Sequence, residues 1–175
     1  MSHYPVLVIT EDEPDYFDIQ RLLAPYDENL DEEGHDPKWD WWEAGGRWAD
    51  ALLLKEGFRA TSAPIAALEG EITDAAREDL EDEWDGLVSE NGTDFFKPEY
   101  YLERFGDADT YIEANSPNVF RAVITPDGEW HEAGLVGWFG VTNDSPDGWR
   151  QYLRDYRKIL ADHRECWGTV VDCHI

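Results

Sequence analysis

The chain ends on the stretch Trp167-Gly168-Thr169-Val170-Val171-Asp172-Cys173-His174-Ile175. Its centre is apolar and β-branched, which is typical of a β-strand. A strand at the very end of a chain frays unless it pairs inside a sheet. We therefore expect residues 168–175 to be a paired strand of a sheet.

Three further strands are expected. Residues 5–10 form a continuous apolar, β-branched run, which indicates a buried strand. Residues 119–125, Val-Phe-Arg-Ala-Val-Ile-Thr, predict a second strand. The tight-turn sequence Pro126-Asp127-Gly128 follows it and leads into 129–133, so these segments predict a β-hairpin.

Four helices are expected between and after these strands. Apolar residues at helical spacing, proline at first-turn positions and a Ser145 cap place them at 14–24, 72–88, 98–105 and 146–162. Residues 57–68 are small and mixed, which predicts a loop. Few strands with segregated helices indicate a single α+β domain over residues 1–175, built on a small, mainly antiparallel sheet.

The net charge of the 175-residue chain is −26, because 40 acidic residues face 14 basic ones. Such a chain is repelled by nucleic acid and by anionic membranes, so direct nucleic-acid binding is not expected. Three explanations of the acidity remain open. It keeps the protein soluble, or it docks the protein on a basic partner in the manner of a DNA mimic, or it binds cations.

The composition also bears on location. No apolar run approaches the ~18 residues that a membrane span needs. Met1-Ser2-His3-Tyr4-Pro5 lacks the basic start of a signal peptide, and two cysteines, Cys166 and Cys173, make no disulfide framework. We expect a cytoplasmic protein with reduced thiols.

Four of the nine tryptophans fall within Lys38-Trp39-Asp40-Trp41-Trp42-Glu43-Ala44-Gly45-Gly46-Arg47-Trp48. Tryptophan faces stack on bases and cations, guanidinium binds carboxylate or phosphate, and adjacent glycines allow close backbone approach. These residues indicate either a packed corner, with Arg47 paired to Asp40 or Glu43, or a wall of a pocket for a small anionic, nucleotide-like ligand. The candidate ligand-binding residues are Trp39, Trp41, Gly45, Gly46, Arg47, Trp48, Trp130 and Trp138.

A second constellation contains histidine. In a strand, Asp172 and His174 point to one face and Cys173 to the other. A carboxylate beside a histidine orients it as a base or a metal ligand. His131 follows the predicted hairpin turn, so His131, Asp172 and His174 are the candidate catalytic residues, with a simple sheet-end hydrogen bond as the alternative.

No standard catalytic, cofactor or metal motif is present, so neither a cofactor nor a metal is assigned. A zinc site built from His131, His174 and a carboxylate remains a minor alternative.

Several motifs resemble a family of phage, prophage and bacterial proteins without an established activity. The resemblance spans the chain, and its motifs are Leu23-Ala24-Pro25-Tyr26-Asp27-Glu28-Asn29, Trp39-Asp40-Trp41 with Gly45-Gly46-Arg47-Trp48, Thr125-Pro126-Asp127-Gly128-Glu129-Trp130-His131-Glu132, Gly137-Trp138-Phe139-Gly140, and Val171-Asp172-Cys173-His174-Ile175. It implies a viral or prophage accessory protein in the bacterial cytoplasm, with action against host defences as one expectation.

Three functions are therefore expected from the sequence. The leading hypothesis is a protein that binds a small nucleotide-like anion in a Trp/Arg-lined pocket. The second is a hydrolase that acts on such a ligand through His131, Asp172 and His174, with or without a metal. The third is an acidic inhibitor of a basic, nucleic-acid-binding host protein.

Overall fold

The structure is a computed structural model that describes residues 2–30, 36–90, 96–135 and 142–175. Its elements run in the order β1 (His3–Thr10), α1 (Tyr16–Leu23), η1 (Ala24–Tyr26), β2 (Trp41–Ala44), η2 (Gly46–Trp48), β3 (Leu52–Leu53), β4 (Arg59–Ala60), β5 (Ser62–Pro64), η3 (Ile65–Ala67), α2 (Asp74–Leu87), α3 (Pro98–Phe105), α4 (Ala108–Ala114), β6 (Ala122–Ile124), β7 (Trp130–Glu132), α5 (Pro146–Asp162) and β8 (Trp167–His174). Here η marks a short 3₁₀ helix.

The C-terminal strand β8 lies inside a six-stranded sheet whose path runs β2-β8-β1-β6-β7. It pairs antiparallel with the whole of β1, from His3 opposite His174 to Thr10 opposite Trp167. On its other edge it pairs with β2 and β5. Only β1 and β6 are parallel among the described pairs, so the predicted α+β fold with a mainly antiparallel sheet is confirmed.

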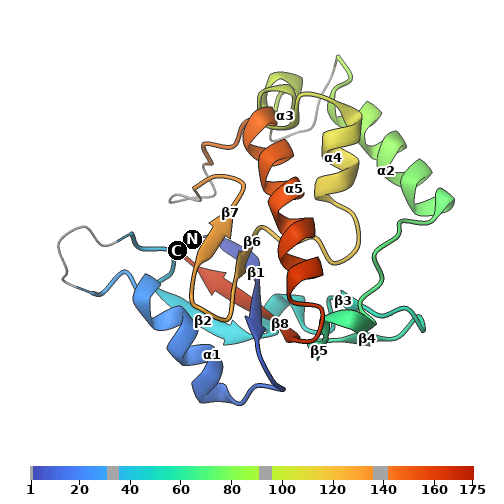
Figure 1. The fold of residues 1–175 in the computed structure, drawn as a ribbon. Coiled ribbons are helices and arrows are strands. Elements are labelled where there is room, and N and C mark those ends of the chain that lie inside the picture. The colour runs from blue at the N-terminus through green and yellow to red at the C-terminus, as the bar shows by residue number, and fades with distance from the viewer. Residues whose placement is uncertain (1, 31–35, 91–95, 136–141) are drawn as a thin grey trace.

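Apolar side chains cover both faces of the sheet, because successive strand residues point to opposite sides. Leu7 and Val170 face α5 and the larger cluster of buried residues. Val6 and Val171 face α1 and a smaller cluster. Figure 1 shows α1 on one side of the sheet and α5 on the other, with α2, α3 and α4 gathered beyond α5.

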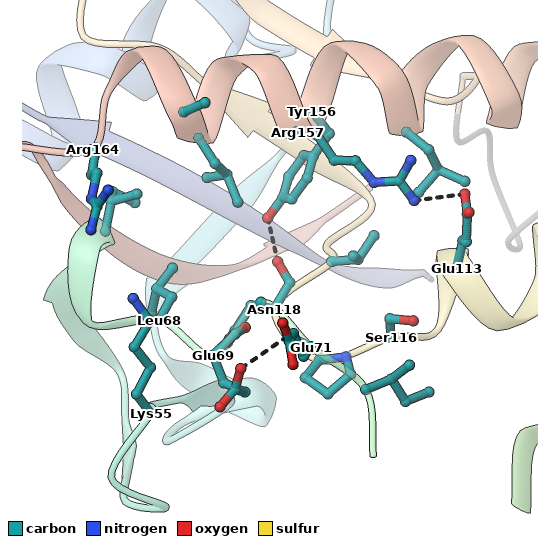
Figure 2. Close-up of a pocket in the computed structure, with 18 of the residues that line it drawn as sticks. Lys55, Leu68, Glu69, Glu71, Glu113, Ser116, Asn118, Tyr156, Arg157 and Arg164 are labelled. Carbon is teal, nitrogen blue, oxygen red and sulfur yellow. Dashed lines mark hydrogen bonds and ion pairs between the residues drawn. The ribbon is translucent and has the colours of Figure 1, made fainter. Parts of the chain in front are cut away.

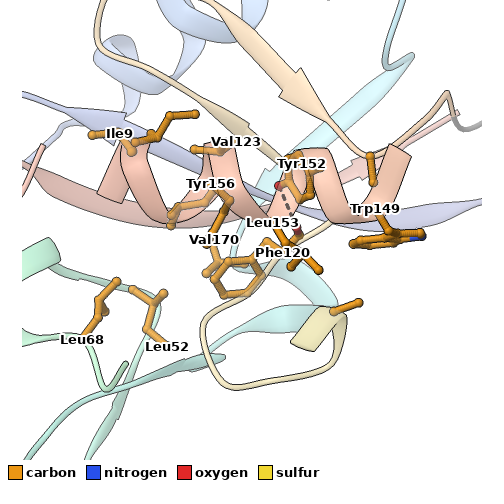
Figure 3. Packing of buried hydrophobic residues seen from close by; sticks show 14 of the residues in the cluster. Ile9, Leu52, Leu68, Phe120, Val123, Trp149, Tyr152, Leu153, Tyr156 and Val170 are labelled. Carbon is orange, nitrogen blue, oxygen red and sulfur yellow. Dashed lines mark hydrogen bonds between the residues drawn. The ribbon is translucent and has the colours of Figure 1, made fainter. Parts of the chain in front are cut away.

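Helix α5 supplies five of the 19 buried residues of the larger cluster. Ser145 caps its first turn by accepting the Gly148 N–H, and Pro146 occupies a position that needs no donor. Its buried stripe includes Tyr152 and Tyr156, whose rings pack among the apolar side chains of Figure 3. Their hydroxyls donate to the carbonyls of Phe120 and Asn118, so burial leaves neither unpaired.

The sequence-predicted helices and strands agree with the structure to within a few residues at their ends. The loop predicted at 57–68 is wrong, because the short strands β4 and β5 and the turn η3 lie there. Two- and three-residue strands leave no periodicity to detect. The strand predicted at 119–125 is shortened to Ala122–Ile124, since Asn118 adopts a left-handed conformation just before it (φ 60°).

The two ends of the chain meet. Ser2 and Ile175 exchange two backbone hydrogen bonds of 3.0 Å, which extends the β1–β8 pairing by one residue on each strand. Within the described ranges, no helix combines the length and the apolarity needed to cross a membrane.

Candidate functional site

Four titratable side chains from separate parts of the chain gather at one end of the sheet, where β1 begins and β8 ends. They are His3, Asp40, Asp172 and His174. The register places His3 opposite His174, and Trp41 opposite His174 on the other side. Residues opposite each other in a sheet share a face, so these groups are held together by backbone pairing.

The first pair is His3 with Asp172. His3 Nδ1 lies 2.9 Å from Asp172 Oδ1, and Asp172 is only 1 % exposed. The second carboxylate oxygen, Oδ2, accepts the backbone N–H of Arg47 at 3.1 Å. A buried carboxylate requires such partners, and the two bonds fix its orientation.

Gly46 makes this arrangement possible. Its backbone is left-handed (φ 51°), and a Cβ added there would lie 2.5 Å from Asp172 Cβ and 2.7 Å from Asp172 Oδ2. The preceding Gly45 is also left-handed (φ 75°), and its N–H donates to Val170 O at 2.8 Å. The Gly-Gly pair therefore lets the chain turn directly against β8, which is the close approach that its sequence indicates.

The second pair is His174 with Asp40. His174 Nδ1 forms a short hydrogen bond with Asp40 Oδ1, and the Asp40 N–H donates to His174 O at 2.9 Å. The rings of His3 and His174 lie edge to face, with centroids 4.8 Å apart. The His3 side chain is 19 % exposed, whereas His174 is largely buried, with 11 % of its side chain exposed.

The two pairs define which imidazole nitrogens are available. An ionised carboxylate accepts hydrogen bonds and donates none, so each neutral imidazole carries its proton on Nδ1. Each Nε2 is then left with a lone pair, and neither Nε2 has a hydrogen-bond partner among the described residues. Two oriented imidazoles side by side can take up one proton while delivering another.

The surroundings add an aromatic face and a cation. Trp41 is 47 % exposed, and its ring lies 6.2 Å from that of His3. The backbone N–H of Arg47 donates to Asp172, and the Arg47 side chain is exposed. Within the described ranges its guanidinium forms no hydrogen bond or ion pair, so it is paired with neither Asp40 nor Glu43.

The structure places the other described tryptophans of the predicted ligand site in two separate clusters. Trp39 and Trp130 pack with α1, on the opposite face, and Trp39 donates its indole N–H to Leu23 O at 3.0 Å. Trp48 packs against the larger cluster. Trp138 lies outside the described residues.

His131 is also placed elsewhere. It lies on β7, opposite Val123, whereas His174 lies on β8, with the two strands β6 and β1 between them. Its nearest charged partner is Glu129, with 3.7 Å between Nε2 and Oε2. Of the three candidate catalytic residues, the structure thus brings Asp172 and His174 into one cluster and leaves His131 apart.

Cys173 points away from the cluster. It lies in the core beneath α1, and burial, together with the charge of Asp172, raises its thiol pKa well above the usual range. A thiol with a raised pKa carries little thiolate at neutral pH, so Cys173 is not the nucleophile of this site.

Sequence reasoning missed His3 and the role of Asp40. His3 precedes the apolar run of β1 and carries no local signal. Only the full-length antiparallel pairing of β1 with β8 brings it opposite His174.

Among the described residues, no group of three or more His, Cys, Asp or Glu side chains converges in a way that would hold a metal ion. Comparisons with family models, curated proteins and solved structures give no match for this chain, so its geometry carries the interpretation.

Proposed function

We propose that the protein is an acid–base enzyme that hydrolyses a phosphoester bond in a small, nucleotide-like anion, using His3 and His174. The observation that carries the proposal is the pair of rings 4.8 Å apart, each with Nδ1 held by a carboxylate. A histidine with a purely structural role does not require a second oriented imidazole beside it.

The proposed step balances without a further reactant. One imidazole takes a proton from water at Nε2 while the water oxygen bonds to phosphorus. The other starts as an imidazolium, with protons on both Nδ1 and Nε2. It gives its Nε2 proton to the leaving oxygen as the phosphorus–oxygen bond breaks. Asp172 stabilises the imidazolium form of His3, and Asp40 stabilises that of His174. Neither carboxylate needs to move.

Two neighbours suit an anionic substrate with a flat ring. The exposed guanidinium of Arg47 offers planar donors to a phosphate. The half-exposed ring of Trp41 offers a face for stacking beside His3. The two motifs of the phage-protein resemblance that contain Asp40 and His174 also meet at this place, which supports a shared role for them.

The experiment measures hydrolysis of bis(p-nitrophenyl) phosphate and of the ribodinucleotide UpA by the purified protein. We expect turnover that falls by about 100-fold or more in His3→Gln and in His174→Gln. His131→Gln is the matched control, because it removes a partly exposed histidine near a carboxylate on the same sheet. It should keep the wild-type rate.

Two outcomes would overturn the proposal. One is recovery of both substrates intact from the wild-type protein at all pH values between 5 and 9. The other is an equal loss of rate in His131→Gln and His174→Gln, with all proteins folded by circular dichroism.

A further inference from the structure

A cavity of about 590 Å³ lies at the opposite end of the sheet from the histidines. Its walls come from the C-terminal half of α5, from the segment 65–72 and from the segment 113–119 (Figure 2). Its volume falls within the range of small-molecule sites in proteins.

The floor of this cavity is apolar. Leu68, Leu153 and Tyr156 are buried, and Leu160 is half-buried beside them. The Tyr156 hydroxyl donates to Asn118 O, as Figure 2 shows, so the ring cannot turn its hydroxyl toward a ligand. The floor therefore offers van der Waals contact and no free donor or acceptor from the tyrosine.

Asn118 fixes the wall of the cavity that the segment 113–119 forms. Its side-chain oxygen accepts the Leu53 N–H at 2.8 Å, and its amide group donates to Leu53 O at 2.8 Å and to Glu69 O at 2.7 Å. Its left-handed backbone (φ 60°) is one that asparagine tolerates better than most residues. The cavity is thus formed before any ligand arrives, which lowers the ordering cost of binding.

The cavity lining is much less acidic than the chain as a whole. It holds four of the 14 basic residues of the chain and three of the 40 acidic ones. Glu113 pairs with Arg157, with 2.8 Å between Oε2 and Nη2, which leaves three basic residues and two acidic ones, Glu69 and Glu71, in the lining. In the part of the chain that the structure describes, the guanidinium groups of Arg77 and Arg164 have no hydrogen bond or ion pair.

The arrangement of these cations leaves one side of the cavity available. In Figure 2, Arg164 and Lys55 stand on the side away from the Arg157–Glu113 ion pair. Lys55 is exposed and donates only to Ala66 O among the described residues. A cation-lined rim above an apolar floor matches a molecule with an acidic head and an apolar body.

We propose that this cavity binds a small organic anion with an apolar body, such as a medium-chain carboxylate. The guanidinium rim would take the acidic group by charge-assisted hydrogen bonds. The leucines would take the apolar body.

The cavity is separate from the proposed hydrolytic site. None of His3, Asp40, Asp172 and His174 lines the cavity. Arg164, which does line it, precedes β8, whereas His174 is the last residue of that strand. The inference therefore does not rest on the proposed hydrolysis, and each can fail without the other.

The test measures binding of octanoate, octan-1-ol and inorganic phosphate to the intact protein by titration calorimetry. Octanoate should bind about tenfold or more tightly than either of the other two, because only octanoate carries both the charge and the chain. Arg77→Gln and Arg164→Gln should each weaken octanoate binding by about tenfold and leave octan-1-ol unchanged.

Two further variants complete the design. Ala161→Trp places a large ring at an exposed position of the lining and should reduce binding of octanoate and octan-1-ol alike. Arg154→Gln is the matched control, because Arg154 is exposed on the same helix and bonds to Gln151 outside the lining. Equal affinity for octanoate and octan-1-ol, or an equal loss in Arg154→Gln and Arg164→Gln, would overturn the inference.

Discussion

The two ends of the central sheet hold different sets of side chains, and we propose a different task for each. At the end where β1 starts and β8 stops, two histidines are oriented by two carboxylates near the surface. At the other end, an apolar cavity is rimmed by guanidinium groups and has neither histidine nor aspartate in its lining. Under the two proposals, proton transfer would use the oriented donors and acceptors of the first end, whereas ligand binding would use the cavity of the second.

The two ends of the sheet also differ in the interactions that position their residues. Backbone register positions the histidines, since His3 and His174 are paired residues of two eight-residue strands. Side-chain hydrogen bonds of one asparagine hold the cavity wall. We therefore expect the histidine end to tolerate fewer backbone changes, and the cavity end to depend on single side chains.

The largest expected effect is at Gly46. Gly46→Ala should lower the free energy of unfolding by about 2–5 kcal/mol, because the new methyl group meets Asp172 and the backbone is left-handed. Gly57→Ala is the control, since Gly57 is left-handed (φ 82°) with nothing within 4 Å. It should cost about 1–2 kcal/mol. Urea denaturation measures both, and equal losses would show that the Asp172 contact is unimportant.

The next effect is at Asn118. Asn118→Ala removes three hydrogen bonds from a buried position and should cost about 2–4 kcal/mol. Octanoate binding should fall while hydrolysis continues in the folded fraction. Asn115→Ala, which removes one hydrogen bond from the exposed residue Asn115 to Tyr111 O, should cost less than about 1 kcal/mol. Loss of hydrolysis in folded Asn118→Ala would contradict the separation of the two ends.

The two carboxylates of the histidine end should differ in their effect on rate. Asp172 receives hydrogen bonds on both oxygens, so Asp172→Asn must turn an amide N–H₂ toward one donor. We expect a rate loss of about 100-fold or more through the wrong histidine tautomer. In Asp40→Asn the remaining oxygen can still face His174, so the loss should be about tenfold. Steady-state hydrolysis of bis(p-nitrophenyl) phosphate distinguishes them, and the reverse order would contradict this view of Asp172.

The smallest effect concerns Cys173. Because burial raises the pKa of its thiol, little thiolate forms at pH 8, and iodoacetamide should modify it far more slowly than the half-buried Cys166 in the native protein. Mass spectrometry of the two peptides measures the ratio. Cys173→Ala should keep the hydrolysis rate within about twofold, since the side chain lies on the other face. A large loss of rate would place Cys173 in the chemistry.

The sequence predicts the regular part of this fold well. The apolar runs of β1 and β8 and the apolar stripe of α5 have the periodicities of a strand and a helix, and the structure has them there. The alternation within β8 also places Asp172 and His174 on one face and Cys173 on the other, as observed.

The partners of these residues were not predictable in the same way. His3 and Asp40 reach the cluster through cross-strand register, which no local pattern encodes. The cavity depends on the segments 65–72 and 113–119, whose structure comes from contacts such as those of Asn118 rather than from periodicity. Arg47 illustrates both limits, because its backbone, and not its guanidinium, makes the contact with Asp172.

One crossed measurement tests the separation of the two ends most directly. It compares hydrolysis of bis(p-nitrophenyl) phosphate and binding of octanoate in His174→Gln and in Arg164→Gln. We predict that His174→Gln loses hydrolysis and binds octanoate as the wild type does, and that Arg164→Gln loses octanoate affinity and hydrolyses at the wild-type rate. A loss of both properties in either folded variant would contradict the account.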